Sequence, residues 1–229
     1  MNLKRTIKRA IPKWILNKIL LTFPIIYSLK FVNYETNMSV EAISELLKQL
    51  SLALELEGNI IECGSSRCGA SVIIAKYLQS NRTKKLIYAC DSFEGFDQNE
   101  LHKEKDAGLT NTPDNSFTST SIIYVKSKIT ALGVDSIVIP IKGYFKDTLP
   151  NIDSKFCFAL VDCDLRESMV FCAEAIWPSL VSGGQILFDD YTDNDFMGAR
   201  LAIDQFIDKY RNEIQEHRLL SRLYSVVKK

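Results

Sequence analysis

Histidine is scarce in this chain, which has only His102 and His217, so a metal centre built on several imidazoles is excluded. The six cysteines form no C-x-x-C pair and no zinc spacing, and several lie in or beside apolar runs. Their pattern favours a reducing, cytoplasmic location over a disulfide framework. Net charge is lacking too, because 28 basic side chains balance 28 acidic ones. The composition therefore gives no argument for a nucleic-acid partner.

The amino-terminal segment departs from this balance, because residues 1–30 carry seven lysines or arginines and no acid. Its apolar part, residues 19–29, is too short to span a bilayer, and no small-residue cleavage site follows it. Two interpretations stand. Residues 1–35 form a helical arm that packs on the domain or on a second subunit of a homo-oligomer, or they form a basic amphipathic segment that lies on the inner face of a membrane.

The remaining residues, 36–229, suit a single domain, and a hydrophobic fraction of 46% supplies its core. Apolar spacing predicts helices over residues 39–58, 69–80, 118–134, 166–177 and 196–210. Short apolar runs predict strands over residues 59–64, 85–91, 136–143, 155–164 and 183–190, the last after a Gly-Gly turn. Residues 213–229 are expected to form a final antiparallel pair. Residues 92–116 show no periodicity and are interpreted as a long lid or binding loop.

Strands and helices thus alternate, and the strands are nearly continuous apolar runs, as expected when helices cover both faces of a sheet. The predicted fold is a doubly wound, mostly parallel α/β sheet. In such sheets ligands bind beyond the carboxyl ends of the strands. Acidic residues end four of the predicted strands: Glu62, Asp91, Asp162 and the pair Asp189 and Asp190. Like charges side by side cost free energy unless a cation holds them, and the competing interpretation is a solvated acidic loop.

The first strand ends in ECGSSRCG, residues 62–69. Gly64 permits a tight turn and Gly69 a close approach where the next helix begins. The segment does not carry the G-x-G-x-x-G pattern of dinucleotide sites, and Glu62 suits a ligand with a cationic group or hydroxyls better than a pyrophosphate. Asp91 can accept both hydroxyls of a ribose. An ordinary strand–helix turn and a helix-capping Asp91 remain the alternatives.

Asp162, Asp189 and Asp190 supply hard oxygen ligands, which suit Mg²⁺ or Mn²⁺, and Asp164 can substitute for one of them. A divalent cation lowers the pKa of a bound hydroxyl and orients it. A metal ion is therefore the expected occupant of this acidic site. His102 lies in the expected lid, either as a solvated side chain or as an assisting base.

A more specific signal comes from the ordered strings ECGSSRCGAS, DSFEGF, KGYFKDTLP, LVDCDLRES, SGGQILFDDY and GARLAIDQF. Together they resemble the macrocin O-methyltransferase family, which consists of metal-dependent and S-adenosylmethionine-dependent class I methyltransferases. The resemblance runs from about residue 59 to residue 206. It departs from the family pattern after Asp162, where Arg166 takes the place of a usual tyrosine.

The resemblance implies a role for each matching residue. The methionine part of the cofactor is expected near Glu62, Gly64 and Ser65, and the ribose near Asp91 and Ser92. The adenine is expected near Gly143, Tyr144 and Phe145. Asp162, Asp189 and Asp190 are implied as Mg²⁺ ligands, with Asp162 also taking the proton of the acceptor hydroxyl.

The function that follows is the transfer of a methyl group from S-adenosylmethionine to a hydroxyl of a sugar or glycosylated acceptor. Two alternatives come from other classes. A non-catalytic nucleoside-binding module would have no need for three metal ligands. A dinucleotide-dependent oxidoreductase fits an acid-rich rim poorly, since pyrophosphate prefers bare amide groups.

Overall fold

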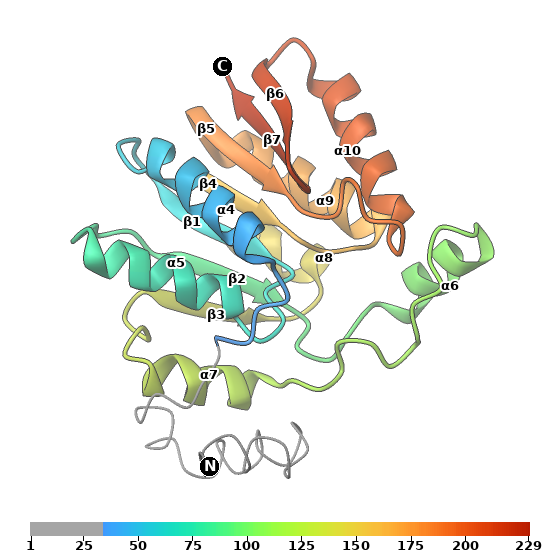
Figure 1. The fold of residues 1–229 in the computed structure, drawn as a ribbon, viewed down its shortest axis with the longest axis horizontal. Coiled ribbons are helices and arrows are strands. Elements are labelled where there is room, and N and C mark those ends of the chain that lie inside the picture. Colours follow the sequence, from blue (N-terminus) through green and yellow to red (C-terminus); the bar gives the residue numbers. More distant parts are fainter. Residues whose placement is uncertain (1–33) are drawn as a thin grey trace, which may run out of the picture.

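The computed structural model describes residues 34–229, which contain one seven-stranded sheet in the order β3-β2-β1-β4-β5-β7-β6 (Figure 1). The first five strands are parallel, and β7 pairs antiparallel with β5 and with β6. The strands are β1 (Asn59–Cys63), β2 (Ile87–Asp91), β3 (Val138–Lys142), β4 (Phe156–Val161), β5 (Leu180–Phe188), β6 (Ile214–Leu220) and β7 (Leu223–Lys228). The predicted doubly wound fold and the final antiparallel pair are confirmed.

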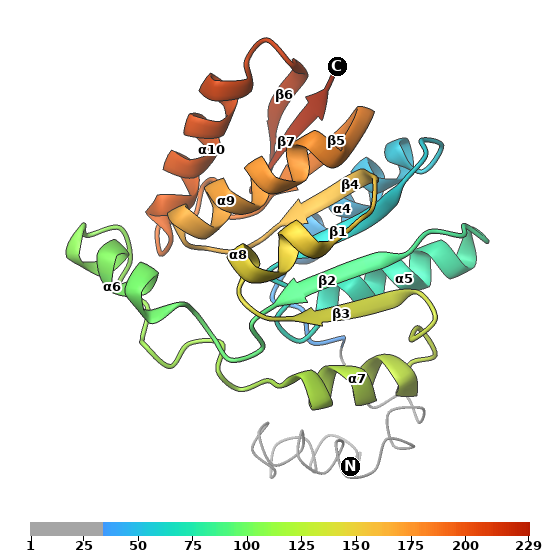
Figure 2. The ribbon, with the colours of Figure 1, turned by 180° about the vertical axis from the view of Figure 1, so that it is seen from behind.

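Helices cover both faces of the sheet, as Figures 1 and 2 show from opposite sides. One apolar core joins the first face to α4 (Val40–Ala53), α5 (Gly69–Ser80) and α7 (Ile122–Ala131). A second core joins the other face to α9 (Arg166–Ile176) and α10 (Met197–Tyr210), and the short α8 (Phe145–Thr148) borders it. All six cysteines are free and buried, as expected without a disulfide framework.

The first described helix is shorter than predicted. Ser39 caps α4, its hydroxyl accepting a hydrogen bond from the amide of Ala42. The helix ends at Ala53 instead of reaching Gly58, which has a φ of +102° and lies directly before β1. A Cβ at Gly58 would stand 3.0 Å from the backbone of residues 155–157, so the lack of a side chain here permits the close approach of these two chain segments.

The prediction of a Gly-Gly turn before β5 is wrong. The strand begins at Leu180, so Gly183 and Gly184 lie inside it. The pairing of β4 with β5 moves from Phe156–Leu180 to Phe158–Gln185, which marks a bulge across these glycines. The additional residues of β5 therefore form a bulge within the strand and not a separate turn.

Residues 92–116, predicted to lack secondary structure, contain the helix α6 (Gln98–Asp106). Its buried side chains are Glu100, Leu101 and Glu104, so the inward face is mostly acidic and leaves no apolar period to detect. A usable signal existed in Asp97, whose carboxylate caps the amides of Asn99 and Glu100. The helix projects beyond the carboxyl edge of the sheet (Figures 1 and 2) and contacts the start of α9.

The backbone ladder continues one residue past the strand ends and fixes the acidic rim. The amide of Asp162 donates to Cys63 O at 2.9 Å, and the amide of Asp189 donates to Val161 O at 3.0 Å.

The expected arm, residues 1–35, lies almost entirely outside the described residues, so its packing and membrane contact stay predictions. Within residues 34–229, no helix has both the length and the apolar character needed to cross a membrane.

Candidate active site

The turn after β1 brings three segments together. Gly64 has a φ of +89° and its amide donates to Cys90 O on β2. Gly69 begins α5 beneath the chain at Thr36, where an added Cβ would stand 2.7 Å from the Thr36 backbone. Glycine at residue 69 thus lets residues 35–38 cross the start of α5 and form one wall of the site.

Glu62 lies at the floor of the site with an exposure of 2%. Its carboxylate accepts a hydrogen bond from the Ser71 hydroxyl, and burial raises its pKa to about 7. Close by, the buried Ser65 Oγ has no hydrogen-bond partner among the described residues. A buried polar atom without a partner costs free energy, which makes Ser65 a candidate contact for a polar ligand.

Asp91 ends β2, and both of its oxygens hold loop backbone. One oxygen accepts from the amide of Ser66 at 2.8 Å and the other from the amide of Phe93 at 2.6 Å. Burial raises the pKa of this carboxyl. The neighbouring Ser92 hydroxyl donates to Gly95 O at 2.6 Å and so has only acceptor capacity left. Both residues line the cavity described below.

The segment after β3 contributes Tyr144 and Phe145, which line the same cavity. Tyr144 is 44% exposed and precedes the short helix α8. Gly143, the third residue implied for the adenine, does not line the cavity. Its φ of +145° and the 2.7 Å approach of Thr148 Cγ2 to an added Cβ point to a role in the turn instead.

The acids at the ends of β4 and β5 form a cluster. One carboxylate oxygen from each of Asp162, Asp164 and Asp190 lies within 4.8 Å of the other two. Asp164 and Asp190 both have a φ of +62°, a left-handed conformation that costs free energy outside glycine and often accompanies function. This set replaces Asp189 of the predicted trio with Asp164.

Electrostatic repulsion in the cluster is large. Burial, followed by the charges of Asp189 and Asp190, raises the pKa of Asp162 well above its usual value. Burial and the charge of Asp190 do the same to the pKa of Asp164. The pKa of Asp190 rises to about 7 through burial and the charge of Asp189. Such a group of hard oxygens is suited to a divalent cation.

Arg222 contacts the acidic cluster and is not among the residues predicted from the sequence. Its Nε donates to Asp189 Oδ1 at 2.7 Å and its Nη2 donates to Asp190 Oδ1 at 2.6 Å. Asp189 Oδ1 also accepts the amide of Asp190 at 2.8 Å. The available signal was the predicted final hairpin, whose tip carries a basic residue toward the rim where the parallel strands end.

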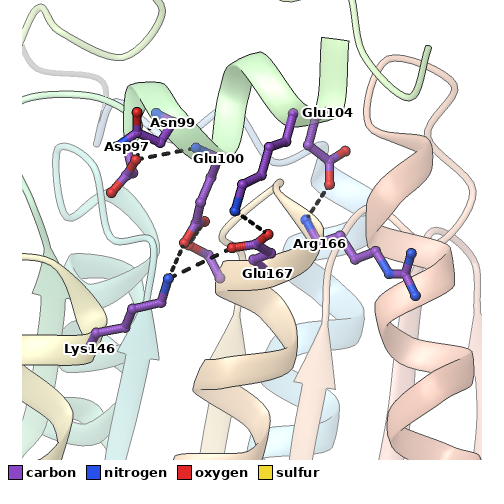
Figure 3. Close-up of polar contacts among 9 residues, drawn as sticks. Asp97, Asn99, Glu100, Glu104, Lys146, Arg166 and Glu167 are labelled. Carbon is purple, nitrogen blue, oxygen red and sulfur yellow. Dashed lines mark hydrogen bonds and ion pairs between the residues drawn. The ribbon is translucent and has the colours of Figure 1, made fainter. Parts of the chain in front are cut away.

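Helix α6 is fastened over the site by polar contacts, which Figure 3 shows. The Glu100 carboxylate accepts from Lys146 Nζ of α8 at 2.9 Å and from Ser168 Oγ of α9 at 2.6 Å. The Glu104 carboxylate accepts from the amide of Arg166, the first residue of α9, at 2.9 Å. Glu100 is 5% exposed and itself lines the cavity.

These parts enclose a cavity of about 310 Å³. Apart from Gly143, it is lined by every residue that the sequence implies for the cofactor and the metal. Three aromatic side chains also line the cavity. The ring of Phe96 meets that of Phe117 edge to face at 5.2 Å between ring centroids and lies 6.1 Å from that of Phe196. His102 is absent from this lining. Its 59% exposed side chain lies 3.7 Å from Asp114, which fits the solvated interpretation.

The seven-stranded, mostly parallel sheet with flanking helices and a cavity at its carboxyl edge has the class I methyltransferase-like fold that the sequence predicts. The model of the macrocin O-methyltransferase family, TylF, matches residues 39–222, so the chain belongs to that family. The family predicted from the sequence is therefore confirmed.

Two curated relatives are similar over part of the chain. A 28% identical stretch of 144 residues matches 8-demethyl-8-(2,3-dimethoxy-alpha-L-rhamnosyl)-tetracenomycin-C 4'-O-methyltransferase of Streptomyces olivaceus, covering 61% of this chain and 55% of that enzyme. A 28% identical stretch of 138 residues matches demethyldecarbamoylnovobiocin O-methyltransferase of Streptomyces niveus, covering 58% and 53%. The matched stretch thus spans about half the length of each relative.

Solved structures share the fold. The O-methyltransferase NovP superposes with a TM-score of 0.71 at 17% identity, covering 93% of this chain and 99% of that one. The calicheamicin methyltransferase CalS11 superposes with a TM-score of 0.64 at 19% identity, covering 93% and 90%.

Proposed function

We propose that this protein transfers a methyl group from S-adenosylmethionine to a hydroxyl of a sugar or glycosylated acceptor, with the help of Mg²⁺ or Mn²⁺. The observation that carries the proposal is one cavity that joins Glu62, Ser65 and Asp91 to the acidic cluster. Family membership supports it, as does the relative named for a rhamnosyl acceptor. A solved neighbour, TomG, is described in complex with SAM.

The first half of the cavity suits the methyl donor. Glu62 offers a buried carboxylate to the cationic amino group of the methionine part, and Ser65 Oγ offers the unpaired polar atom beside it. Asp91 presents its carboxylate where β2 ends, the usual place for a ribose contact. Tyr144 and Phe145 give the adenine an aromatic and apolar surface.

The second half suits a divalent cation. The converging oxygens of Asp162, Asp164 and Asp190 are hard donors, and their mutual repulsion is relieved by positive charge. Asp189 lies beside them and is the fourth carboxylate of the group. When bound, the ion supplies Lewis acidity that lowers the pKa of an acceptor hydroxyl. The protein's own part is to hold that hydroxyl in line with the methyl group.

A carboxylate of the cluster receives the acceptor proton. We assign this role to Asp162, which directly follows β4 and lines the cavity as one of the converging carboxylates. Asp164 belongs to the same cluster and lines the same cavity. Both residues are also proposed metal ligands, so Asp162→Asn and Asp164→Asn are compared at saturating Mn²⁺, with Mn²⁺ binding measured in parallel. The variant that lacks the base loses turnover while Mn²⁺ and S-adenosylmethionine still bind.

The acceptor side has both apolar and polar surfaces. Phe96, Phe117 and Phe196 offer ring faces and edges against which an acceptor ring can pack. The acidic cluster, which lines the same cavity, offers acceptors for hydroxyl groups. This combination suits a sugar-containing molecule better than a fully apolar one.

The first experiment is a calorimetric titration of the purified protein with S-adenosylmethionine, in Mg²⁺ and then in chelator, with NAD⁺ in parallel. Micromolar binding of the methyl donor and none of NAD⁺ is expected. A preference for NAD⁺ would favour the oxidoreductase alternative. Donor binding without turnover on any sugar acceptor, together with no Mg²⁺ effect, would favour the binding module.

A further inference from the structure

Arg222 reaches the acidic rim because of the strand register. The tip of the β6–β7 hairpin consists of Ser221 and Arg222, and Ser221 has a φ of +59°. The antiparallel pairing of β5 with β7 sets Phe188 opposite Tyr224. β5 ends at Phe188 and β7 begins at Leu223, so Asp189, Asp190 and Arg222 all lie just beyond the paired ends of these two strands. The hairpin therefore delivers a guanidinium to the end of β5.

The contact between Arg222 and the two aspartates is largely buried and hydrogen-bonded. Asp189 is 2% exposed and Asp190 is 3% exposed, and the Arg222 side chain covers them while remaining 34% exposed itself. Each carboxylate receives one charge-assisted hydrogen bond, at 2.7 and 2.6 Å. Among residues 34–229, the ion pairs recorded at the four clustered aspartates all come from Arg222.

We infer that Arg222 is a built-in counter-cation of the metal site. It neutralises the Asp189–Asp190 pair when no metal ion is bound, and it lowers the affinity for the ion by competing for the same carboxylates. The inference rests on the proposed metal dependence. Asp190 belongs both to the pair held by Arg222 and to the converging cluster with Asp162 and Asp164, so a divalent ion and the guanidinium meet at this residue.

The charge of the cluster explains why it can interact with both the Arg222 guanidinium and a divalent ion. Four carboxylates, two buried and two half-buried, face one guanidinium and leave an excess of negative charge, which a divalent ion can still relieve. Without Arg222 the excess grows, so the metal-free fold loses stability and the site attracts a divalent ion more strongly. A residue that merely shaped the site would act in the opposite direction, because disordered ligands bind a metal less well.

The test is Mn²⁺ binding to the full chain, followed by electron paramagnetic resonance, for the wild type, Arg222→Gln and Arg222→Lys. Arg218 is exposed on β6, so Arg218→Gln removes the same charge from the same hairpin and serves as the control. Arg222→Gln should bind Mn²⁺ at least about tenfold more tightly than the wild type. Arg222→Lys keeps the positive charge but not the two parallel N–H donors of the guanidinium, so its Mn²⁺ affinity should lie between those of the wild type and Arg222→Gln. Arg218→Gln should match the wild type.

Thermal unfolding provides a second readout that needs no turnover. In chelator Arg222→Gln should melt below the wild type, and saturating Mn²⁺ should raise its Tm by more than it raises that of the wild type. Equal or weaker Mn²⁺ binding by Arg222→Gln would overturn the inference while leaving metal dependence intact. No binding by any of the proteins would overturn the metal site itself, and binding by Arg222→Gln alone would support the competition.

Discussion

Gly64 and Asp162 approach so closely that a Cβ added at Gly64 would stand 1.7 Å from the carbonyl oxygen of Asp162. Gly64 directly follows β1 and Asp162 directly follows the neighbouring strand β4. One belongs to the donor side of the cavity and the other to the acidic cluster. Because residue 64 has no side chain, the donor side of the candidate active site and its acidic cluster can lie this close to each other.

Gly64→Ala should destabilise the fold and disturb both halves at once. The backbone at residue 64 has a φ of +89°, and the new Cβ has no room, so a loss of at least about 2 kcal/mol in the free energy of unfolding is expected. Urea denaturation measures it. Gly108→Ala is the control, because its φ is +68° but no described atom lies within 4 Å, and strain alone should cost about 1 kcal/mol. Equal losses in the two variants would show that the Asp162 contact is unimportant.

Asp91→Asn should weaken the binding of S-adenosylmethionine. The asparagine keeps one acceptor oxygen, so the hydrogen bond from either Ser66 or Phe93 is lost along with the charge. A Kd increase on the order of tenfold is expected from calorimetry. Unchanged affinity would remove Asp91 from the donor site.

Replacing Asp189 and Asp190 together with asparagine should abolish methyl transfer and its metal dependence while leaving the Kd for S-adenosylmethionine within about threefold. Asp195, exposed in the same loop, offers the matched control Asp195→Asn, which should behave as the wild type. The measurement is the initial rate of methyl transfer by the wild type and both variants, in Mg²⁺ and in chelator. Full activity of the double variant in chelator would disprove the metal role.

Glu62 should make the ligand-free protein less stable as pH rises. Its pKa is raised from the ordinary 4.5 to about 7 by burial, so between these values the folded state binds more protons than the unfolded state. The stability that protonated Glu62 contributes is complete below pH 4.5 and is lost as pH rises through about 7, with an amplitude on the order of 2–3 kcal/mol. Glu62→Gln cannot titrate, so the difference in unfolding free energy between wild type and variant should fall across this window. A flat difference would contradict the prediction.

Glu100→Ala should release helix α6 from the core. The variant loses the contacts to Lys146 and Ser168, so hydrogen exchange of the α6 amides should quicken on the order of tenfold and the acceptor KM should rise. Lys103→Ala removes the exposed pair with Glu167 and should change exchange little. If both variants exchanged alike, the buried carboxylate would not be what fastens the helix.

Much of the fold could be predicted because its signals are local. The apolar runs that became β1, β2 and β4 carry their own burial pattern, and each acid or glycine that follows marks a strand end. Helix α6 escaped because Glu100 and Glu104 face inward in place of apolar residues. The bulge across Gly183 and Gly184 escaped because a Gly-Gly pair is as typical of a turn as of a strand irregularity.

The sequence by itself determined the doubly wound class, the family and the set of acids at the carboxyl edge, because these depend on residue types at short spacing. Only the tertiary structure decided which acids converge, since Asp164 joins Asp162 and Asp190 through backbone conformation that spacing does not reveal. It alone also set Arg222 against Asp189 and Asp190. That contact joins residues 32 and 33 positions apart through strand register, and register is settled by the pairing of whole strands.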